Sequence, residues 1–149
     1  MNTLAKTFSA AALIAVSTFT MAAVKPAVSN PKTAAVNLST ADLAIDHYVA
    51  VMTAGQSAGV EQLFAADFNQ KVQGSDDKTN TRSEVISFLK KQRGEQLNCK
   101  TNTTIIEESS DYMVAKVTQQ FEGFTKTDLV TLVNDGETWK VTQSINSYK

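Results

Sequence analysis

The sequence has little cysteine, histidine or proline, and almost no net charge. Its 149 residues include one cysteine, one histidine and two prolines, and 14 basic side chains nearly balance 15 acidic ones. The single cysteine, Cys99, cannot form an intramolecular disulfide, and its position in a predicted strand favours a small buried side chain over a nucleophile. The net charge of -1 gives no electrostatic reason to expect nucleic acid as a partner. Stability must therefore come from an apolar core, which a chain of this length can bury.

No cofactor and no metal ion are predicted from the sequence. Asp76 and Asp77 are adjacent acids in a polar stretch, but no regular spacing of further oxygen ligands follows them. We therefore interpret this pair as a solvated acidic turn.

The chain also lacks an apolar run long enough to span a membrane. Residues 8–19 form an Ala-rich apolar run after Lys6, about twelve residues long against the roughly 20 that a spanning helix needs. Small residues follow at Thr20 and Ala22. This pattern is typical of a secretory signal peptide at residues 1–22, which predicts an exported protein, periplasmic or secreted, with no membrane span after cleavage. A retained N-terminal anchor is the alternative.

The rest of the chain divides into a leader and one domain. Residues 23–38 hold Lys, Pro, Ser, Asn and Ala without a hydrophobic period, which predicts a flexible leader. Residues 39–149 show no internal repeat and are predicted to form a single domain.

Two helices are predicted at the start of this domain. The first begins at a capping Ser39 or Thr40 and runs to about Thr53, and a shorter one follows Ser57. His47 lies off the apolar face of the first helix, so we interpret it as a partly exposed side chain and not as a catalytic one. The apolar faces are Ala41, Ala44, Ile45, Tyr48, Val51 and Met52 in the first helix, and Val60, Leu63, Phe64 and Phe68 in the second.

A short strand, a loop and a third helix are predicted next. Residues 68–73 are consistent with an edge strand, and residues 74–80 are too polar to be anything but a loop. Thr81 and Glu84 match a capping box, which predicts a helix that ends near Gly94.

Four long strands complete the domain. Residues 97–107 are predicted to form the first of them. Turns at Glu122-Gly123 and Asp135-Gly136 then divide residues 112–148 into a three-stranded antiparallel meander, because glycine supplies the positive φ that such turns need.

The register of the meander assigns each side chain to a face of the sheet. If both turns have two-residue loops, Val117 lies opposite Asp128, and Asp128 lies opposite Gln143. The predicted inner face is largely apolar, with Met113, Ala115, Val117, Phe121, Phe124, Val130, Leu132, Trp139, Val141 and Ile145. A polar group interrupts it, made of Gln119, Lys126, Asp128 and Gln143. The predicted outer face carries Tyr112, Val114, Leu129, Val133 and Tyr148, and the inward set of the preceding strand is Leu97, Cys99, Thr101, Thr103 and Ile105.

This order of elements predicts an α+β domain in which three N-terminal helices pack on the concave face of a curved antiparallel sheet, forming a cone. Mostly apolar walls with a few convergent polar groups are typical of small-molecule sites. We predict a ligand pocket between the sheet and the helices, lined by Asp128, Gln143, Gln119, Tyr48 and Trp139.

Three stretches between about Thr40 and Tyr148 carry a family resemblance. They are HYVAVMTAGQSAGVEQLFAADF for the first two helices, RSEVISFLKK for the third helix, and LVNDGETWKVTQSINSY for the closing hairpin. The sequence resembles the nuclear transport factor 2-like superfamily, in particular the small exported bacterial members grouped with the SnoaL-like and putative lumazine-binding families. The resemblance implies a cystatin-like cone and, because such domains often dimerise there, a homodimer through the outer sheet face.

The resemblance also bears on catalysis. Enzymes of this superfamily use an Asp, or an Asp with a His, that projects into the cone. Asp128 matches such a carboxylate, whereas His47 lies off the apolar stripe, and Gly55-Gln56 stands where members commonly have Gly-Asp.

Three functions are compatible with these features. The first is noncatalytic binding of a small apolar or aromatic ligand that Asp128 orients. The second is an isomerase, cyclase or hydrolase that uses Asp128 as a general base, with its pKa raised by burial. The third is an association module, because Val114, Leu129 and Val133 would otherwise leave apolar surface in water. Asp128 could also be satisfied by Lys126 or other protein donors without any ligand.

Overall fold

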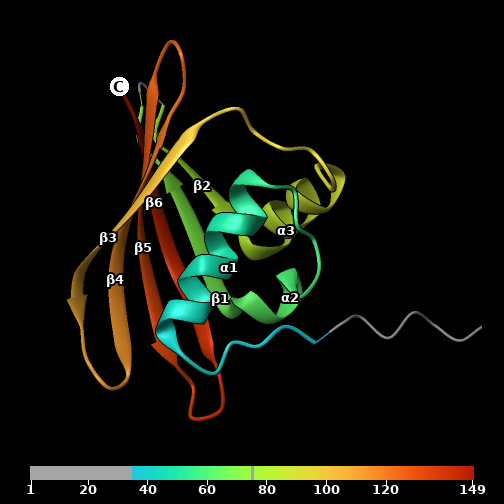
Figure 1. Ribbon diagram of the computed structural model, residues 1–149, viewed down its shortest axis with the longest axis vertical. Coiled ribbons are helices and arrows are strands. Elements are labelled where there is room, and N and C mark those ends of the chain that lie inside the picture. Colours follow the sequence, from blue (N-terminus) through green and yellow to red (C-terminus); the bar gives the residue numbers. More distant parts are fainter. Residues whose placement is uncertain (1–34, 75) are drawn as a thin grey trace, which may run out of the picture. The chain divides into compact units, whose positions relative to one another are not determined.

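A computed structural model describes residues 35–74 and 76–149 of the protein (Figure 1). The predicted signal peptide and most of the predicted leader lie outside these residues. The described part contains, in chain order, α1 (Ala41–Thr53), α2 (Val60–Leu63), β1 (Phe64–Val72), β2 (Lys78–Thr81), α3 (Arg82–Lys91), β3 (Lys100–Glu108), β4 (Tyr112–Gln120), β5 (Thr125–Asn134) and β6 (Trp139–Tyr148).

The strands form one curved sheet in the order β2-β1-β6-β5-β4-β3, and the three helices of the described residues lie on one face of it (Figure 1). The α1 helix packs over β4, β5 and β6, and α3 packs over β1 and β2. The predicted fold class, α+β with helices on the concave face, is confirmed. One detail differs, because β1 and β6 run parallel while the other neighbouring strands are antiparallel.

The first helix forms where its capping signals predict. Its N-cap is Thr40, whose hydroxyl accepts a hydrogen bond from the Leu43 backbone N–H at 3.2 Å. Helical geometry ends at Ala54, and Gly55 follows with a φ of 60°. The prediction for His47 was wrong. Its side chain is buried, because the loop after α1 folds back and brings the Ala58 carbonyl within 2.9 Å of Nε2.

The second helix is shorter than predicted and gives way to a strand. It ends at Leu63, and Phe64 already has extended backbone angles. Phe64 and Phe68 are both buried on β1. A spacing of four residues places side chains on one face of either a helix or a strand, so the apolar pattern alone could not separate the two.

The first strand is also not an edge strand. It lies between β2 and β6, and in the described part of the chain the edges of the sheet are β2 and β3. The β2 strand begins at Lys78, inside the stretch predicted to be a loop. Its pairing with β1 is short, from Asn69 opposite Thr81 to Val72 opposite Lys78. The sequence of β2 has no alternation of hydrophobic and polar residues that would predict a strand.

The third helix confirms the predicted capping box. The Thr81 backbone N–H donates to Glu84 Oε2 at 2.7 Å, and the Glu84 backbone N–H donates to Thr81 Oγ1 at 3.5 Å. The buried face of α3 consists of Val85, Ile86 and Leu89, and the side that carries Ser87 and Phe88 is exposed.

The first hairpin of the meander has the predicted register, and the second does not. Val117 lies opposite Asp128. In the second hairpin Trp139 lies opposite Asn134, so the loop has four residues and not two. Side-chain bonds explain this length, because Asp135 Oδ1 accepts from the backbone N–H of Glu137 and Thr138 at 3.1 and 2.9 Å. A shift of two residues changes the partners and keeps every side chain on its face.

A β-bulge in β6 then exchanges the faces. Leu132 lies opposite Val141 and Thr131 lies opposite Gln143, so Thr142 is one extra residue in β6. Asn146, and not Gln143, therefore lies opposite Asp128. The predictions for three residues were wrong for this reason: Gln143 and Ile145 belong to the outer face, and Tyr148 to the inner face.

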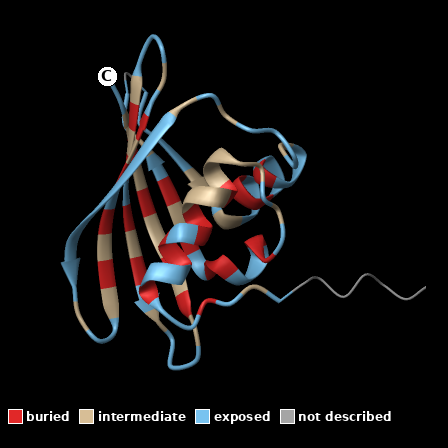
Figure 2. Cartoon of the chain, viewed as in Figure 1, coloured by how far each residue is buried: buried red, intermediate tan, exposed pale blue. Residues whose placement is uncertain are grey.

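The edge strand β3 keeps its predicted facing and stays exposed. Thr101, Thr103 and Ile105 lie opposite Gln119, Val117 and Ala115 of β4, but every residue of β3 is exposed (Figure 2). The strand starts at Lys100, so Leu97 and Cys99 precede it. Cys99 is half-buried and its sulfur lies 3.7 Å from Thr101 Oγ1, so it is not the core residue that was predicted.

Candidate functional site

A cluster of buried polar side chains occupies one end of the inner sheet face. Gln119 comes from β4, Lys126 and Asp128 from β5, and Ser144 and Asn146 from β6. The alternation of strand side chains brings Lys126 and Asp128 to the same face, and the bulge brings Ser144 and Asn146 there. The cluster therefore depends on both the pleat of β5 and the irregularity of β6.

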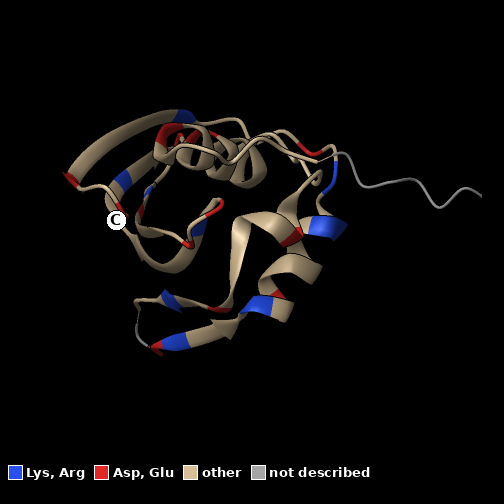
Figure 3. Cartoon of the chain, turned by 90° about the horizontal axis from the view of Figure 1, so that it is seen from below, with Lys and Arg blue, Asp and Glu red and all other residues tan. Residues whose placement is uncertain are grey.

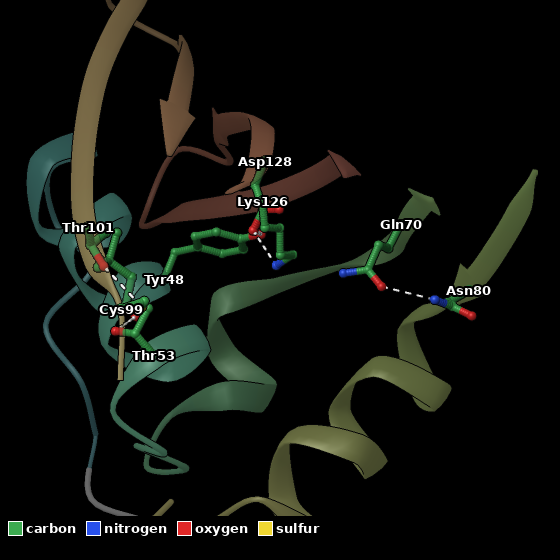
Figure 4. Close-up of polar contacts among 9 residues, drawn as sticks. Tyr48, Thr53, Gln70, Asn80, Cys99, Thr101, Lys126 and Asp128 are labelled. Atoms are coloured by element: carbon green, nitrogen blue, oxygen red, sulfur yellow. Dashed lines mark hydrogen bonds and ion pairs between the residues drawn. The ribbon is translucent and has the colours of Figure 1, made fainter. Parts of the chain in front are cut away.

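Asp128 is the centre of this cluster. It has no exposed surface. Its Oδ2 atom accepts from the Lys126 ammonium at 2.9 Å and from the Tyr48 hydroxyl at 3.2 Å (Figure 4). Tyr48 projects from α1, so this carboxylate connects the helix layer to the sheet.

Other polar atoms of the cluster lack partners. Asp128 Oδ1, Gln119 Nε2 and Asn146 Oδ1 are buried and have no hydrogen-bond partner among the described residues. A buried polar atom without a partner costs about 1 to 3 kcal/mol of stability, and native proteins contain few of them. The cluster thus has spare hydrogen-bonding capacity at one place on the sheet.

A pocket of about 660 Å³ opens next to this cluster, between α3, β1, β2 and the ends of β5 and β6. Lys126 and Asn146 form its wall on the side of the cluster. On the opposite side lie Gln70 and Asn80, joined by a hydrogen bond of 2.9 Å from Asn80 Nδ2 to Gln70 Oε1 (Figure 4). The exposed aromatic side chains Phe88 of α3 and Tyr148 near the chain terminus complete it, together with the buried Val85.

Burial and charge act on Asp128 in opposite directions. Desolvation by burial raises the pKa of the Asp128 carboxyl, and the Lys126 ammonium and the Tyr48 hydroxyl offset part of that rise. The pKa of Tyr148 is also raised, first by burial and then by the charge of Asp128. His47 lies elsewhere, against Ala58, and burial lowers its pKa, which keeps the imidazole neutral at pH 7.

Comparison with known proteins identifies the family. The family model described as "Putative lumazine-binding" matches residues 37–145. The chain belongs to this family. Among proteins with curated functions, no sequence matches it.

Solved structures show that this member of the putative lumazine-binding family has the nuclear transport factor 2-like fold. A protein of unknown function from Pectobacterium atrosepticum has a TM-score of 0.58 and 21% identity, over 75% of this chain and 90% of that chain. A nuclear transport factor 2-like protein of unknown function from Silicibacter pomeroyi has a TM-score of 0.56 and 16% identity, over 72% and 90%. A putative ketosteroid isomerase from Parabacteroides distasonis has a TM-score of 0.54 and 11% identity, over 76% and 91%. Similarity at these identities shows the fold alone.

Three of the five site residues predicted for this family member come together. Tyr48 is bonded to Asp128, and Gln119 lies beside them, opposite Lys126 in the β4–β5 pair. None of the three lines the pocket, whose nearest wall is Lys126 and Asn146.

The other two predicted site residues lie elsewhere. Gln143 faces outward because of the bulge, and its Nε2 donates to Asn69 Oδ1 at 3.2 Å. Trp139 is at the opposite end of β6, where its backbone N–H donates to the Leu38 carbonyl at 2.8 Å. That bond and the burial of Leu38 also show that packing begins within the stretch predicted as leader.

Three pocket residues were missed or given no role from the sequence. Lys126 was recognised as inward but not as a site residue. Asn146 was not predicted because the bulge in β6 turns it to the inner face. Gln70 was not predicted because β1 was expected to be an edge strand, whereas it lies inside the sheet. Within the described residues, no group of three or more His, Cys, Asp and Glu side chains could hold a metal ion, and no helix is long and apolar enough to cross a membrane.

The raised pKa of Asp128 predicts the sign of a pH effect on stability. The folded state holds the Asp128 proton more tightly than the unfolded state does, so this residue stabilises the fold at low pH. That contribution is lost as the pH rises from the ordinary carboxyl pKa, about 3.9, through the raised one. Urea unfolding of the wild type and Asp128→Asn across this range should give a difference in unfolding free energy, wild type minus variant, that falls as pH rises.

Asp135→Asn provides a control of opposite sign. Lys140 and the loop N–H groups lower the pKa of the exposed Asp135 carboxyl, so the corresponding difference for this variant should rise with pH up to the ordinary carboxyl pKa, about 3.9, and stay nearly level above it. An Asp128→Asn difference that also rises with pH would show that Lys126 and Tyr48 outweigh burial, contrary to our prediction.

Proposed function

We propose that the protein is an exported, noncatalytic domain that binds a small molecule in the pocket between α3, β1, β2 and the ends of β5 and β6. The observation that carries the proposal is the position of this pocket against a buried polar cluster with unpartnered atoms. A ligand that enters the pocket reaches Lys126 and Asn146 directly, and the family description is in keeping with ligand binding.

The dimensions and lining of the pocket support this proposal. A volume of about 660 Å³ lies within the range of small-molecule sites, roughly 300 to 1,000 Å³. Phe88 and Tyr148 line it and are 56% and 51% exposed, so two aromatic side chains are accessible to a ligand. Polar side chains such as Lys126, Asn146 and Gln70 together with apolar ones such as Phe88 and Val85 match the usual composition of such sites, in which a few polar groups orient the ligand and apolar side chains form the rest of the wall.

The same geometry favours binding over acid–base catalysis. A general base must come within about 2.6 to 3.2 Å of the proton that it removes. Asp128 is fully buried behind Lys126, does not line the pocket, and has Oδ2 occupied by two donors. The one histidine is bonded to Ala58 and is not a lining residue.

A substitution that fills the pocket tests ligand binding. Ser87 is an exposed residue of α3 that lines the pocket, so Ser87→Trp should fill part of it with little effect on stability. In a thermal-shift and calorimetric screen of one- to three-ring aromatic compounds, those that bind the wild type should lose at least roughly tenfold in affinity. Ser110→Trp, in an exposed turn away from the pocket, is the control. Equal loss in both variants, or none in Ser87→Trp, contradicts a site in this pocket.

Export is tested by the N-terminus of the mature protein. The Lys6 charge, the short apolar run and the small residues Thr20 and Ala22 favour cleavage at the end of the signal peptide. Sequencing of protein recovered from the cell envelope or medium of a bacterial host should begin near Ala23 or Val24. The variant Leu13→Arg should remain uncleaved inside the cell. An intact Met1 on exported wild-type protein contradicts the proposal.

A second copy of the chain is the partner that we propose for the outer sheet face. With the corrected register, Leu129 lies opposite Ile145, and Leu129 and Val133 are 38% and 36% exposed among threonines. Leu129→Lys should weaken self-association and leave the monomer folded, as measured by analytical ultracentrifugation on the order of 10 μM protein. Gln56→Lys, in the exposed loop after α1, should leave association unchanged. A wild type that sediments as a monomer contradicts the dimer.

A further inference from the structure

We infer that the ligand of the pocket is an organic anion, an aromatic or apolar body that carries a carboxylate-like group, and that this group binds between Lys126 and Gln70. The inference rests on the proposed function, since it assigns a chemical class to the molecule that the pocket binds.

Two hydrogen-bond donors face one another across the pocket. Gln70 Oε1 is occupied by Asn80 Nδ2, so the amide nitrogen of Gln70 points the other way, toward the Lys126 ammonium (Figure 4). Both side chains line the pocket and are more than nine-tenths buried, at 8% and 9% exposed. Among the described residues, Gln70 makes its side-chain hydrogen bond through Oε1, and its amide nitrogen is not one of the fully buried polar atoms, so this nitrogen can donate to a ligand in the pocket. A group that binds between these donors must accept hydrogen bonds from both sides.

The ammonium can serve such a group without leaving Asp128. Lys126 has three N–H donors, and Asp128 Oδ2 is the acceptor for one of them. Asp128 and Gln70 lie on different sides of the ammonium (Figure 4), so a second carboxylate on the Gln70 side shares the cation and stays apart from Asp128. Charge-assisted bonds of this kind are about twice as strong as neutral ones.

The charges around the pocket also favour an anion. Lys78, Lys91 and Lys126 line it, and Glu84 is the one acid among its described lining residues. The carboxylate of Glu84 is held in the capping box, where Oε2 accepts from the N–H and the hydroxyl of Thr81. Lys91 at the end of α3 and Lys78 at the start of β2 are exposed and can attract an anion from solution (Figure 3).

The remaining walls define the rest of the molecule. Phe88 and Tyr148 are large side chains that stay half-exposed at the pocket, and Met52, Val72 and Val85 add apolar surface. An aromatic or aliphatic body can cover these side chains while its charged end reaches Lys126. A purely inorganic anion would leave this apolar part of the pocket unused.

The test compares matched charged and neutral probes. One- to three-ring aromatic carboxylates and their primary carboxamides have nearly the same shape, and binding to the full mature chain can be measured by calorimetry and NMR. We expect carboxylates to bind at least roughly tenfold more tightly than their carboxamides, a difference of about 1.4 kcal/mol.

The variant Gln70→Glu tests the site itself without removing the buried cation. Its carboxylate can still accept from Asn80, and it presents an acceptor in place of a donor to Lys126. Carboxylate binding should fall at least roughly tenfold, and carboxamide binding should change by less than about twofold. Gln120→Glu adds the same charge at an exposed residue of β4 and should change neither.

The outcomes separate this inference from the proposed function. Carboxamides that bind in the pocket as tightly as carboxylates overturn the anion and leave small-molecule binding intact. Carboxylates that bind equally to the wild type and Gln70→Glu overturn the Lys126–Gln70 site. If no probe of either kind binds, both the inference and the proposed function are contradicted.

Discussion

The charge of a buried carboxylate must be balanced by nearby hydrogen-bond donors or a cation. For Asp128 these partners come from both the helix layer and the sheet, so they connect the main parts of this fold. Tyr48 brings a hydroxyl from α1, and Lys126 brings an ammonium from the same strand two residues away. Removing Lys126 would leave the Asp128 carboxylate in the core without its cation, which costs far more than the loss of an ordinary hydrogen bond. Asp128 therefore links α1 to the sheet through Tyr48 and holds the Lys126 side chain, and Lys126 in turn forms part of the pocket wall.

The bulge in β6 is the second constraint. One extra residue, Thr142, turns Asn146 toward Asp128 and Tyr148 toward the pocket, and sends Gln143 to the outer face. Without it, the inner face near the pocket would present a different set of side chains on the same backbone path. Bulges commonly redirect side chains next to functional sites, and here the redirected residues include two that line the pocket.

The sequence predicts the fold well and the site less well, for identifiable physical reasons. Capping at Thr40 and Thr81, and the short turn between β4 and β5, are local signals, and the structure confirms them, although Gly123 does not adopt the positive φ that was expected of it. The four-residue loop at Asp135 and the bulge at Thr142 depend on side-chain bonds and strand twist, which hydrophobic alternation does not record. Asp128 was placed on the correct face because its hairpin is regular. Gln143 was not, because its strand is irregular.

The two ends of the inner sheet face differ in polarity, and the stability of the fold explains only the apolar end. On β4, β5 and β6, Met113, Val130, Leu132 and Val141 are fully buried and apolar. A few residues along the same strands, Gln119, Asp128 and Asn146 are nearly as buried and polar, with atoms that lack partners. Valine or leucine at these three positions would continue the core, and a half-satisfied polar network is less stable than an apolar one. Stability therefore does not explain the polar end, which is the end that adjoins the pocket.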